Sequence, residues 1–141
     1  MAKSGFISKE ELKKNINSLK SFMKQKKLDS FYVSSSDIFL NEYAPLEDCH
    51  RYYLSGFTGS TAELIVPLEG KVILFVDGRY YEQADIEADP NLVHVFKVPY
   101  GTGLRQAMRE VILAKGLKHL GVEGDRLDLS LYNEFSQMVK T

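Results

Sequence analysis

The sequence predicts an α/β domain: a mixed five-stranded sheet with helices on both faces, in three layers. Short apolar segments alternate with segments of helical periodicity along all 141 residues. Two strands flank Leu68-Glu69-Gly70, and this connection is too short for a crossover, so they must form an antiparallel hairpin. The later strands alternate with helices, which favours parallel pairing. Together these observations predict strands of both directions in one sheet.

The first helix is expected to begin at Ser8 and to end near Lys27. Ser8 and Glu11 have the spacing of a capping box, in which each side chain satisfies a free backbone donor. Apolar residues then recur on one stripe, while lysines cover the other face as a solvated surface. Further helices are expected at 79–88, 104–115 and, after a cap at Asp128 or Ser130, around 131–138.

Strands are expected at 30–34, 61–67, 71–76, 93–98 and 119–122. The segment 71–76 is nearly all apolar, so it should be buried on both faces. The strand at 30–34 should be central, and two crossovers should link parallel neighbours with right-handed connections. Residues 35–60 form a long irregular stretch, and such stretches often carry function in a compact domain.

Composition places the chain among ordinary globular domains and narrows its partners. The 18 basic and 19 acidic residues give a net charge of -1, which provides no electrostatic footprint for nucleic acid. No apolar run reaches the roughly 20 residues that span a bilayer. Cys49 is the only cysteine, so no internal disulfide forms. We expect a single domain over residues 1–141 and a cytoplasmic location.

A glycine-rich stretch, Ser55-Gly56-Phe57-Thr58-Gly59-Ser60, precedes the second strand. Its backbone N–H groups would suit an anion. It lacks the Lys-Ser/Thr ending of a P-loop and precedes a strand, not a helix. The alternative is that the glycines permit a turn with positive φ.

The stretch Asp77-Gly78-Arg79-Tyr80 follows the buried strand. Asp77 can cap the next helix, whereas the cation of Arg79 is unfavourable at the positive helix end. We therefore expect a compensating group, either a partner or an internal carboxylate such as Glu42 or Asp48.

Scattered carboxylates raise a nuclease as another possibility. Glu63 and Asp77 belong to the hairpin strands, and a metal-dependent nuclease would place acids there to hold divalent ions. The first strand, however, carries Val33 and Ser34 where such an enzyme needs an acid. The three histidines show no metal-ligand spacing, so no metal ligand and no catalytic residue is assigned.

Two blocks together resemble the Xaa-Pro aminopeptidase branch of the creatinase/prolidase family. They are residues 51–60, RYYLSGFTGS, and residues 76–84, VDGRYYEQA, separated by the hairpin. The resemblance implies an RNase H-like N-terminal domain without nuclease activity. It also implies that a separate pita-bread domain, absent from this chain, binds two divalent ions, usually manganese, and hydrolyses Xaa-Pro peptides. All of those ligands would lie beyond residue 141.

The resemblance further implies a non-catalytic role in dimerisation and in limiting access to the substrate cleft. The expected partners are the catalytic domain, a second copy in a homodimer and the peptide substrate; nucleic acid and membrane are not expected. The candidate cleft or interface residues are Arg51, Tyr52, Phe57, Asp77, Arg79 and Tyr80. Both arginines could instead only brace the loop. The other functional alternatives are the N-terminal domain of a prolidase or creatinase, and a stand-alone anion or nucleotide binder.

Overall fold

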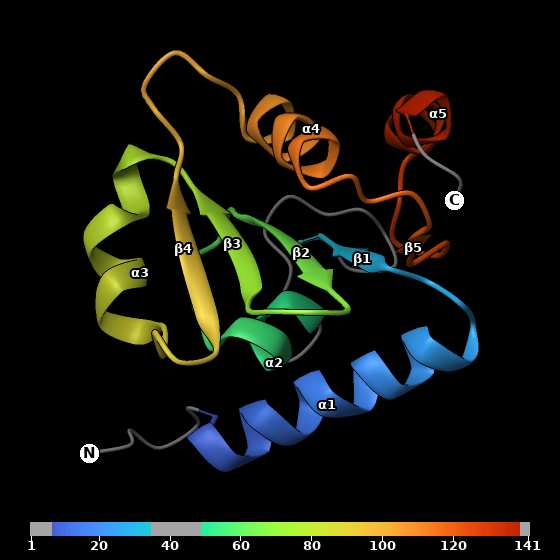
Figure 1. The fold of residues 1–141 in the computed structure, drawn as a ribbon. Coiled ribbons are helices and arrows are strands. Elements are labelled where there is room, and N and C mark those ends of the chain that lie inside the picture. The colour runs from blue at the N-terminus through green and yellow to red at the C-terminus, as the bar shows by residue number, and fades with distance from the viewer. Residues whose placement is uncertain (1–6, 35–48, 139–141) are drawn as a thin grey trace.

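The computed structural model describes residues 7–34 and 49–138, which build one sheet between two helical layers (Figure 1). The strands are β1 (Ser30–Val33), β2 (Glu63–Pro67), β3 (Val72–Val76), β4 (Val93–Lys97) and β5 (Leu120–Val122). Their order is β4-β3-β2-β1-β5, and β2 alone runs against its neighbours. The predicted fold class, a mixed five-stranded sheet with helices on both faces, is confirmed.

Helices cover both faces of this sheet. They are α1 (Lys9–Gln25), α2 (His50–Ser55), the 3-10 turn η2 (Gly78–Tyr80), α3 (Tyr81–Glu87), α4 (Leu104–Ala114) and α5 (Leu129–Met138). Residues of α1 and α3 join one hydrophobic cluster with the sheet, and residues of α4 and α5 join a second cluster on the opposite face. Figure 1 shows α1 and α2 on one side of the sheet and α4 on the other.

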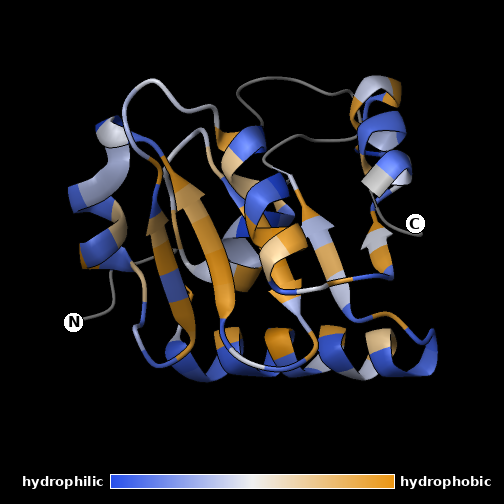
Figure 2. Cartoon of the chain, turned by 45° about the horizontal axis from the view of Figure 1, so that its top comes forward, coloured by the Kyte–Doolittle hydropathy of each residue, from blue (hydrophilic) through white to orange (hydrophobic). Residues whose placement is uncertain are grey.

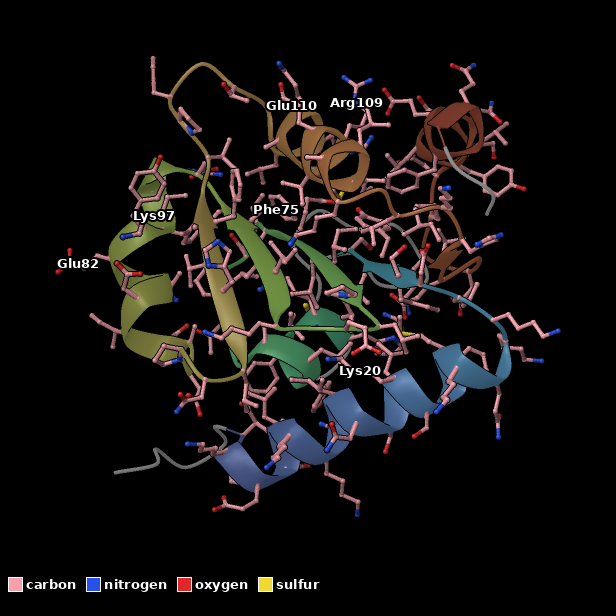
Figure 3. The ribbon with its side chains drawn as sticks, in the orientation of Figure 1. Lys20, Phe75, Glu82, Lys97, Arg109 and Glu110 are labelled. Carbon is pink, nitrogen blue, oxygen red and sulfur yellow. The ribbon has the colours of Figure 1, made fainter. Side chains whose placement is uncertain are left out.

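The strands in the middle are apolar because both of their faces are covered. All five residues of β3 are buried: Leu74 belongs to the α1 side, whereas Ile73 and Phe75 belong to the α4 side. This split follows from the two-residue repeat of a strand. Figure 2 shows apolar strands between helices whose outer faces are polar, and Figure 3 shows Phe75 between the sheet and α4.

Helix α1 begins where the sequence predicts. The Ser8 hydroxyl accepts a hydrogen bond of 3.2 Å from the Glu11 N–H, as an N-cap should. On the outer part of the helix, the Lys20 ammonium donates to the Gly70 carbonyl at the hairpin turn, 2.6 Å away. This bond links α1 to the β2–β3 connection.

The expectation of two crossovers between parallel neighbours is half wrong. The β3–α3–β4 connection does join parallel neighbours. The β4–α4–β5 connection instead crosses the whole sheet, because α4 packs over β2 and β3 and delivers the chain to the far edge beside β1. The free edge of β1 accepts β5 there in parallel register.

The stretch predicted to be irregular contains a helix. Six residues form α2, closed by Gly56 in the left-handed region with φ of 77°. A helix this short shows less than two turns of periodicity, so the apolar pattern does not reveal it. Residues 35–48 lie outside the described part of the chain, as do Glu42 and Asp48.

Candidate functional site

Arg51 holds the glycine-rich loop from inside the protein. Its side chain is 1% exposed, and its guanidinium donates to the carbonyl oxygens of Phe57 at 3.1 Å and Gly59 at 2.5 Å. The same guanidinium carbon lies 5.1 Å from the centre of the Phe57 ring. A fork of donors suits two carbonyl groups better than a single ammonium would. Arg51 therefore braces the loop, which is the simpler of the two roles considered for it.

The amides of Phe57 and Thr58, in the middle of the loop, are already bonded within the chain. The Phe57 N–H donates to the Ser55 hydroxyl at 3.1 Å. The Thr58 N–H donates to one Glu87 oxygen at 2.8 Å, and the Thr58 hydroxyl donates to the other at 2.7 Å. A carboxylate of α3 thus occupies the place that a bound anion would need. This weighs against the anion-binding interpretation of the loop.

Tyr80 joins the second sequence block to this loop. Its hydroxyl lies 2.7 Å from the Ser60 hydroxyl, and its ring packs edge-to-face on the Phe57 ring with centroids 5.5 Å apart. The start of β2 and the end of β3 are neighbours in the sheet, so the two blocks meet at the same end of the strands. The expected proximity of the loop and the Asp77–Tyr80 turn is confirmed for the described residues.

The turn after β3 carries an exposed ion pair. Asp77 accepts from the Arg79 N–H at 3.0 Å and from the Arg79 guanidinium at 3.1 and 2.9 Å. These hydrogen bonds lower the pKa of Asp77 below its usual value. Among the described residues, Asp77 is an acid that compensates Arg79, and it also caps the turn as predicted. The Arg79 side chain is 64% exposed and also lies over the Tyr80 ring.

The six candidate residues divide by depth. Tyr52 is buried, and its hydroxyl accepts from the Ile7 N–H at 2.6 Å, so it faces the start of α1. Arg51 and Phe57 are buried with it. Asp77, Arg79 and Tyr80 reach the surface at least in part. Only this second group presents side chains that another domain could contact directly.

Glu63 carries a carboxyl group in surroundings that the sequence did not predict. Tyr32 donates a short hydrogen bond to its carboxylate, and Arg105 and Asp128 form an ion pair of 3.1 Å nearby. Burial raises the pKa of Glu63 to about 7, although the Tyr32 bond and Arg105 lower it in part. A carboxyl group that holds its proton near neutrality is a poor cation ligand. The one signal in the sequence for this site is that an acidic residue, Glu63, begins an otherwise apolar strand.

A second unpredicted pair lies after β5. The His50 imidazole contacts the Glu123 carboxylate, and the Arg126 guanidinium is 3.9 Å from the same carboxylate. His50 and Glu123 are 73 residues apart, and the fold brings the start of α2 beside the end of β5. No local pattern in the sequence could have paired them.

The described residues contain no group of three or more His, Cys, Asp and Glu side chains that could hold a metal ion. Over the same residues, no helix has the length and apolar character needed to cross a membrane.

Known proteins resemble this chain over most of its length. The profile of the creatinase/prolidase N-terminal domain matches residues 15–141. Xaa-Pro aminopeptidase 1 of Dictyostelium discoideum is 35% identical over 85 residues, which cover 60% of this chain and 13% of that protein. The chain thus spans a small fraction of the length of this curated relative.

Solved structures share the fold. The X-prolyl aminopeptidase of Caenorhabditis elegans, described as a cytosolic enzyme with a di-nuclear active site, superposes with a TM-score of 0.72 at 20% identity, over 92% of this chain and 23% of that one. The N-terminal domain of the cytoplasmic peptidase PepQ from Mycobacterium tuberculosis gives 0.66 at 22% identity, over 89% of this chain and 84% of that one. The chain belongs to the creatinase/prolidase N-terminal domain family.

Proposed function

We propose that this chain is the non-catalytic N-terminal domain of a proline-specific metallo-aminopeptidase and that it shapes access to the cleft of the catalytic domain. The observation that carries the proposal is that internal hydrogen bonds hold the 56–60 loop and join it to the Asp77–Tyr80 turn. The loop and the turn lie at the carboxyl ends of the parallel strands, where open α/β sheets commonly meet their ligands. The Xaa-Pro aminopeptidase relatives support the substrate class.

In this proposal the two sequence blocks, residues 51–60 and 76–84, have different roles. Arg51 and Phe57 keep the loop rigid, and the exposed pair of Asp77 and Arg79 faces the catalytic domain or the peptide. A rigid loop and turn do not have to become ordered each time a peptide binds. They can therefore exclude long or bulky peptides at little entropic cost. The divalent ions, expected to be manganese, belong to the catalytic domain, and two copies of the whole protein form a dimer in the cytoplasm.

The first experiment tests the non-catalytic assignment. Purified chain is incubated with manganese and a peptide with proline in second position, and released amino acid is measured. We expect no release above the protein-free control. Turnover that follows the concentration of this chain would contradict the proposal.

The second experiment tests whether the Asp77–Tyr80 turn limits access to the substrate cleft. The chain is fused ahead of the catalytic domain of an Xaa-Pro aminopeptidase, and KM is compared for a dipeptide and a longer Xaa-Pro peptide. We expect Arg79→Ala to change the ratio of the two KM values and to leave kcat on the dipeptide unchanged. Glu82→Gln, on the exposed face of α3, is the control (Figure 3). An unchanged ratio in the Arg79 variant would remove the turn from the cleft.

A second candidate is the N-terminal domain of a prolidase or creatinase-like hydrolase. The Xaa-Pro dipeptidase of Bacillus anthracis favours it, because that enzyme shares the fold with a TM-score of 0.67 at 20% identity. The same fusion series separates the two, since a prolidase partner would need a free dipeptide carboxylate near the turn. In that case Arg79→Ala would raise KM for the dipeptide most.

A further inference from the structure

A pocket of about 320 Å³ opens on the α4 face of the sheet, beside the outer strand β4. Helix α4 packs over β2 and β3, and β4 lies at the edge of the sheet (Figure 1). The start of β3, the strand β4 and the end of α4 supply the lining: Lys71, Ile73, His94, Phe96, Val111 and Lys115. This volume is at the lower end of the range for ligand pockets, roughly 300–1,000 Å³, so it suits a small molecule.

Strand register gives the pocket an apolar floor. Ile73 and His94 are partners in the parallel β3–β4 ladder, and residues two positions apart in a strand share a face. Phe96 therefore lies on the same face as His94, and Lys71 on the same face as Ile73. Ile73 is 4% exposed, and it belongs with Phe96 to the hydrophobic cluster on the α4 side.

The aromatic rings in this floor are held in place. The Phe96 ring packs on the buried Phe75 ring with centroids 5.2 Å apart. The His94 ring packs edge-to-face on Phe96 with centroids 6.4 Å apart. A ligand that lies on these rings does not have to order them first, which lowers the cost of binding.

Two lysines and a histidine supply the polar groups of the pocket. The side chains of Lys71, His94 and Lys115 are all exposed. Lys115 follows the last residue of α4, and the chain then reaches the start of β5. Because β5 and β3 run in the same direction, Lys115 lies toward the same end of the sheet as Lys71, which precedes β3. Among the described residues, no carboxylate lines the pocket.

Acids close to this part of the sheet form other ion pairs. Asp85 pairs with Lys97 at 2.6 Å, and Asp89 pairs with Lys9 at 3.3 Å. Lys71 acts on Asp89 by charge alone, without an ion pair in the described part of the chain. The pocket therefore combines positive charge at one end with an apolar floor.

The end of α4 does not cancel this charge. The negative end of a helix dipole resides in carbonyl groups that have no hydrogen-bond donor. Here the Val111, Ile112 and Leu113 carbonyls already accept from the N–H groups of residues 115–117, at 2.9, 3.1 and 3.1 Å.

We propose that this pocket binds a small organic carboxylate that carries one apolar or aromatic group and no cationic group. The apolar group would lie on Ile73 and Phe96, and the carboxylate would accept hydrogen bonds from Lys71 and Lys115. Such charge-assisted bonds are stronger than neutral ones. His94 can donate a further N–H even when its ring is neutral.

The lining also predicts which anions bind poorly. A free amino acid carries an ammonium group, and no acid of the pocket would accept from it. Inorganic phosphate would meet the lysines but would leave the apolar floor without a partner. This inference goes beyond the proposed function, because the pocket opens at the start of β3, whereas the Asp77–Tyr80 turn follows its end.

Nuclear magnetic resonance titration of the whole 15N-labelled chain tests the proposal. The probes are 3-phenylpropionate, its neutral amide 3-phenylpropanamide, and inorganic phosphate. We expect saturable shifts at the His94, Phe96 and Lys115 amides with 3-phenylpropionate, with a Kd at or below about 1 mM. The amide and phosphate should each bind at least about tenfold more weakly. Shifts that do not saturate, or equal binding of either control probe, would overturn the proposal.

A pair of double variants checks that the lysines of the pocket bind the carboxylate. Lys71→Gln with Lys115→Gln should weaken 3-phenylpropionate binding by about tenfold, since two charged contacts are lost. Lys24→Gln with Lys118→Gln changes the net charge equally at exposed positions outside the pocket, and it should leave the Kd nearly unchanged. Equal weakening by both double variants would refute the assigned contacts. Either result leaves the cleft role standing, because peptide cleavage tests that role separately.

Discussion

The ring of Phe57 fills the space beside Gly59 that any larger residue would need. A Cβ on Gly59 would lie 2.3 Å from Cζ of Phe57 and 3.0 Å from Cδ1 of Tyr80. Both rings are held, because they pack on each other and Phe57 also lies against Arg51. The close approach, and not a positive φ, therefore explains glycine at this position.

Gly59→Ala should destabilise the domain by about 1–3 kcal/mol, because the added methyl group overpacks a filled site. Gly78→Ala is the matched control: nothing lies within 4 Å of its Cβ position, and it belongs to the second sequence block. We expect the control to stay within about 0.5 kcal/mol of wild type. Urea denaturation measures both. Equal midpoints for the two variants would contradict the packing explanation.

Arg51→Met should cost about 2–4 kcal/mol of stability. The substitution keeps much of the apolar stem but leaves the Phe57 and Gly59 carbonyls without their shared donor in a buried place. Arg51→Lys should recover only part of the loss, because one ammonium cannot reproduce the fork. The comparison is made by thermal and urea unfolding of each variant.

The matched control for Arg51 is Arg79→Met. Arg79 is exposed and its pair with Asp77 is solvated, so its removal should change the free energy of unfolding by less than about 1 kcal/mol. If both arginine variants unfold alike, the bracing role assigned to Arg51 is wrong.

Thr58 and Glu87 should show a coupling energy of about 1–2 kcal/mol in a double-mutant cycle. The Glu87 carboxylate accepts from both the N–H and the hydroxyl of Thr58, and the Thr58→Val and Glu87→Gln variants remove or weaken the hydroxyl bond. The cycle is measured by urea denaturation. Pairing Thr58→Val with Glu82→Gln instead should give additive effects, since Glu82 is exposed on α3.

Glu63 should make stability depend on pH near neutrality. Its pKa is raised from 4.5 to about 7 in the folded protein, so the folded state keeps a proton that the unfolded state loses. The resulting stabilisation is complete below about pH 4.5 and is lost as the pH rises through about 7. Between pH 5 and 8, wild type should lose about 2–3 kcal/mol relative to Glu63→Gln.

The comparison isolates Glu63 because all other titrating groups are shared by both proteins. The charged or titratable groups that face its carboxyl are Tyr32 from β1, Arg105 from α4, Arg51 from α2 and Asp128 before α5. Free energies of unfolding are measured in urea at each pH. Parallel curves for wild type and Glu63→Gln would show that this carboxyl does not titrate in the window.

Local signals in the sequence were reliable wherever a few neighbouring residues decide the outcome. The Ser8 cap and the Asp77 cap depend on bonds between residues two or three positions apart, and the hairpin depends on the short connection between β2 and β3. The apolar run of β3 was equally clear, because a strand covered on both faces needs no polar residue. Helix α2 escaped prediction because six residues contain too little periodicity.

The sequence by itself determined the strands, the longer helices, the mixed sheet and the family, because hydrophobic periods, caps and two linked motifs act over short spans. Only the tertiary structure decided that Arg51 and Phe57 lie inside and Arg79 outside, that Glu63 meets Tyr32, and that β5 crosses to the far edge. These outcomes depend on which surfaces the helices cover. Burial and long-range pairing are properties of the assembled layers, and no single segment carries them.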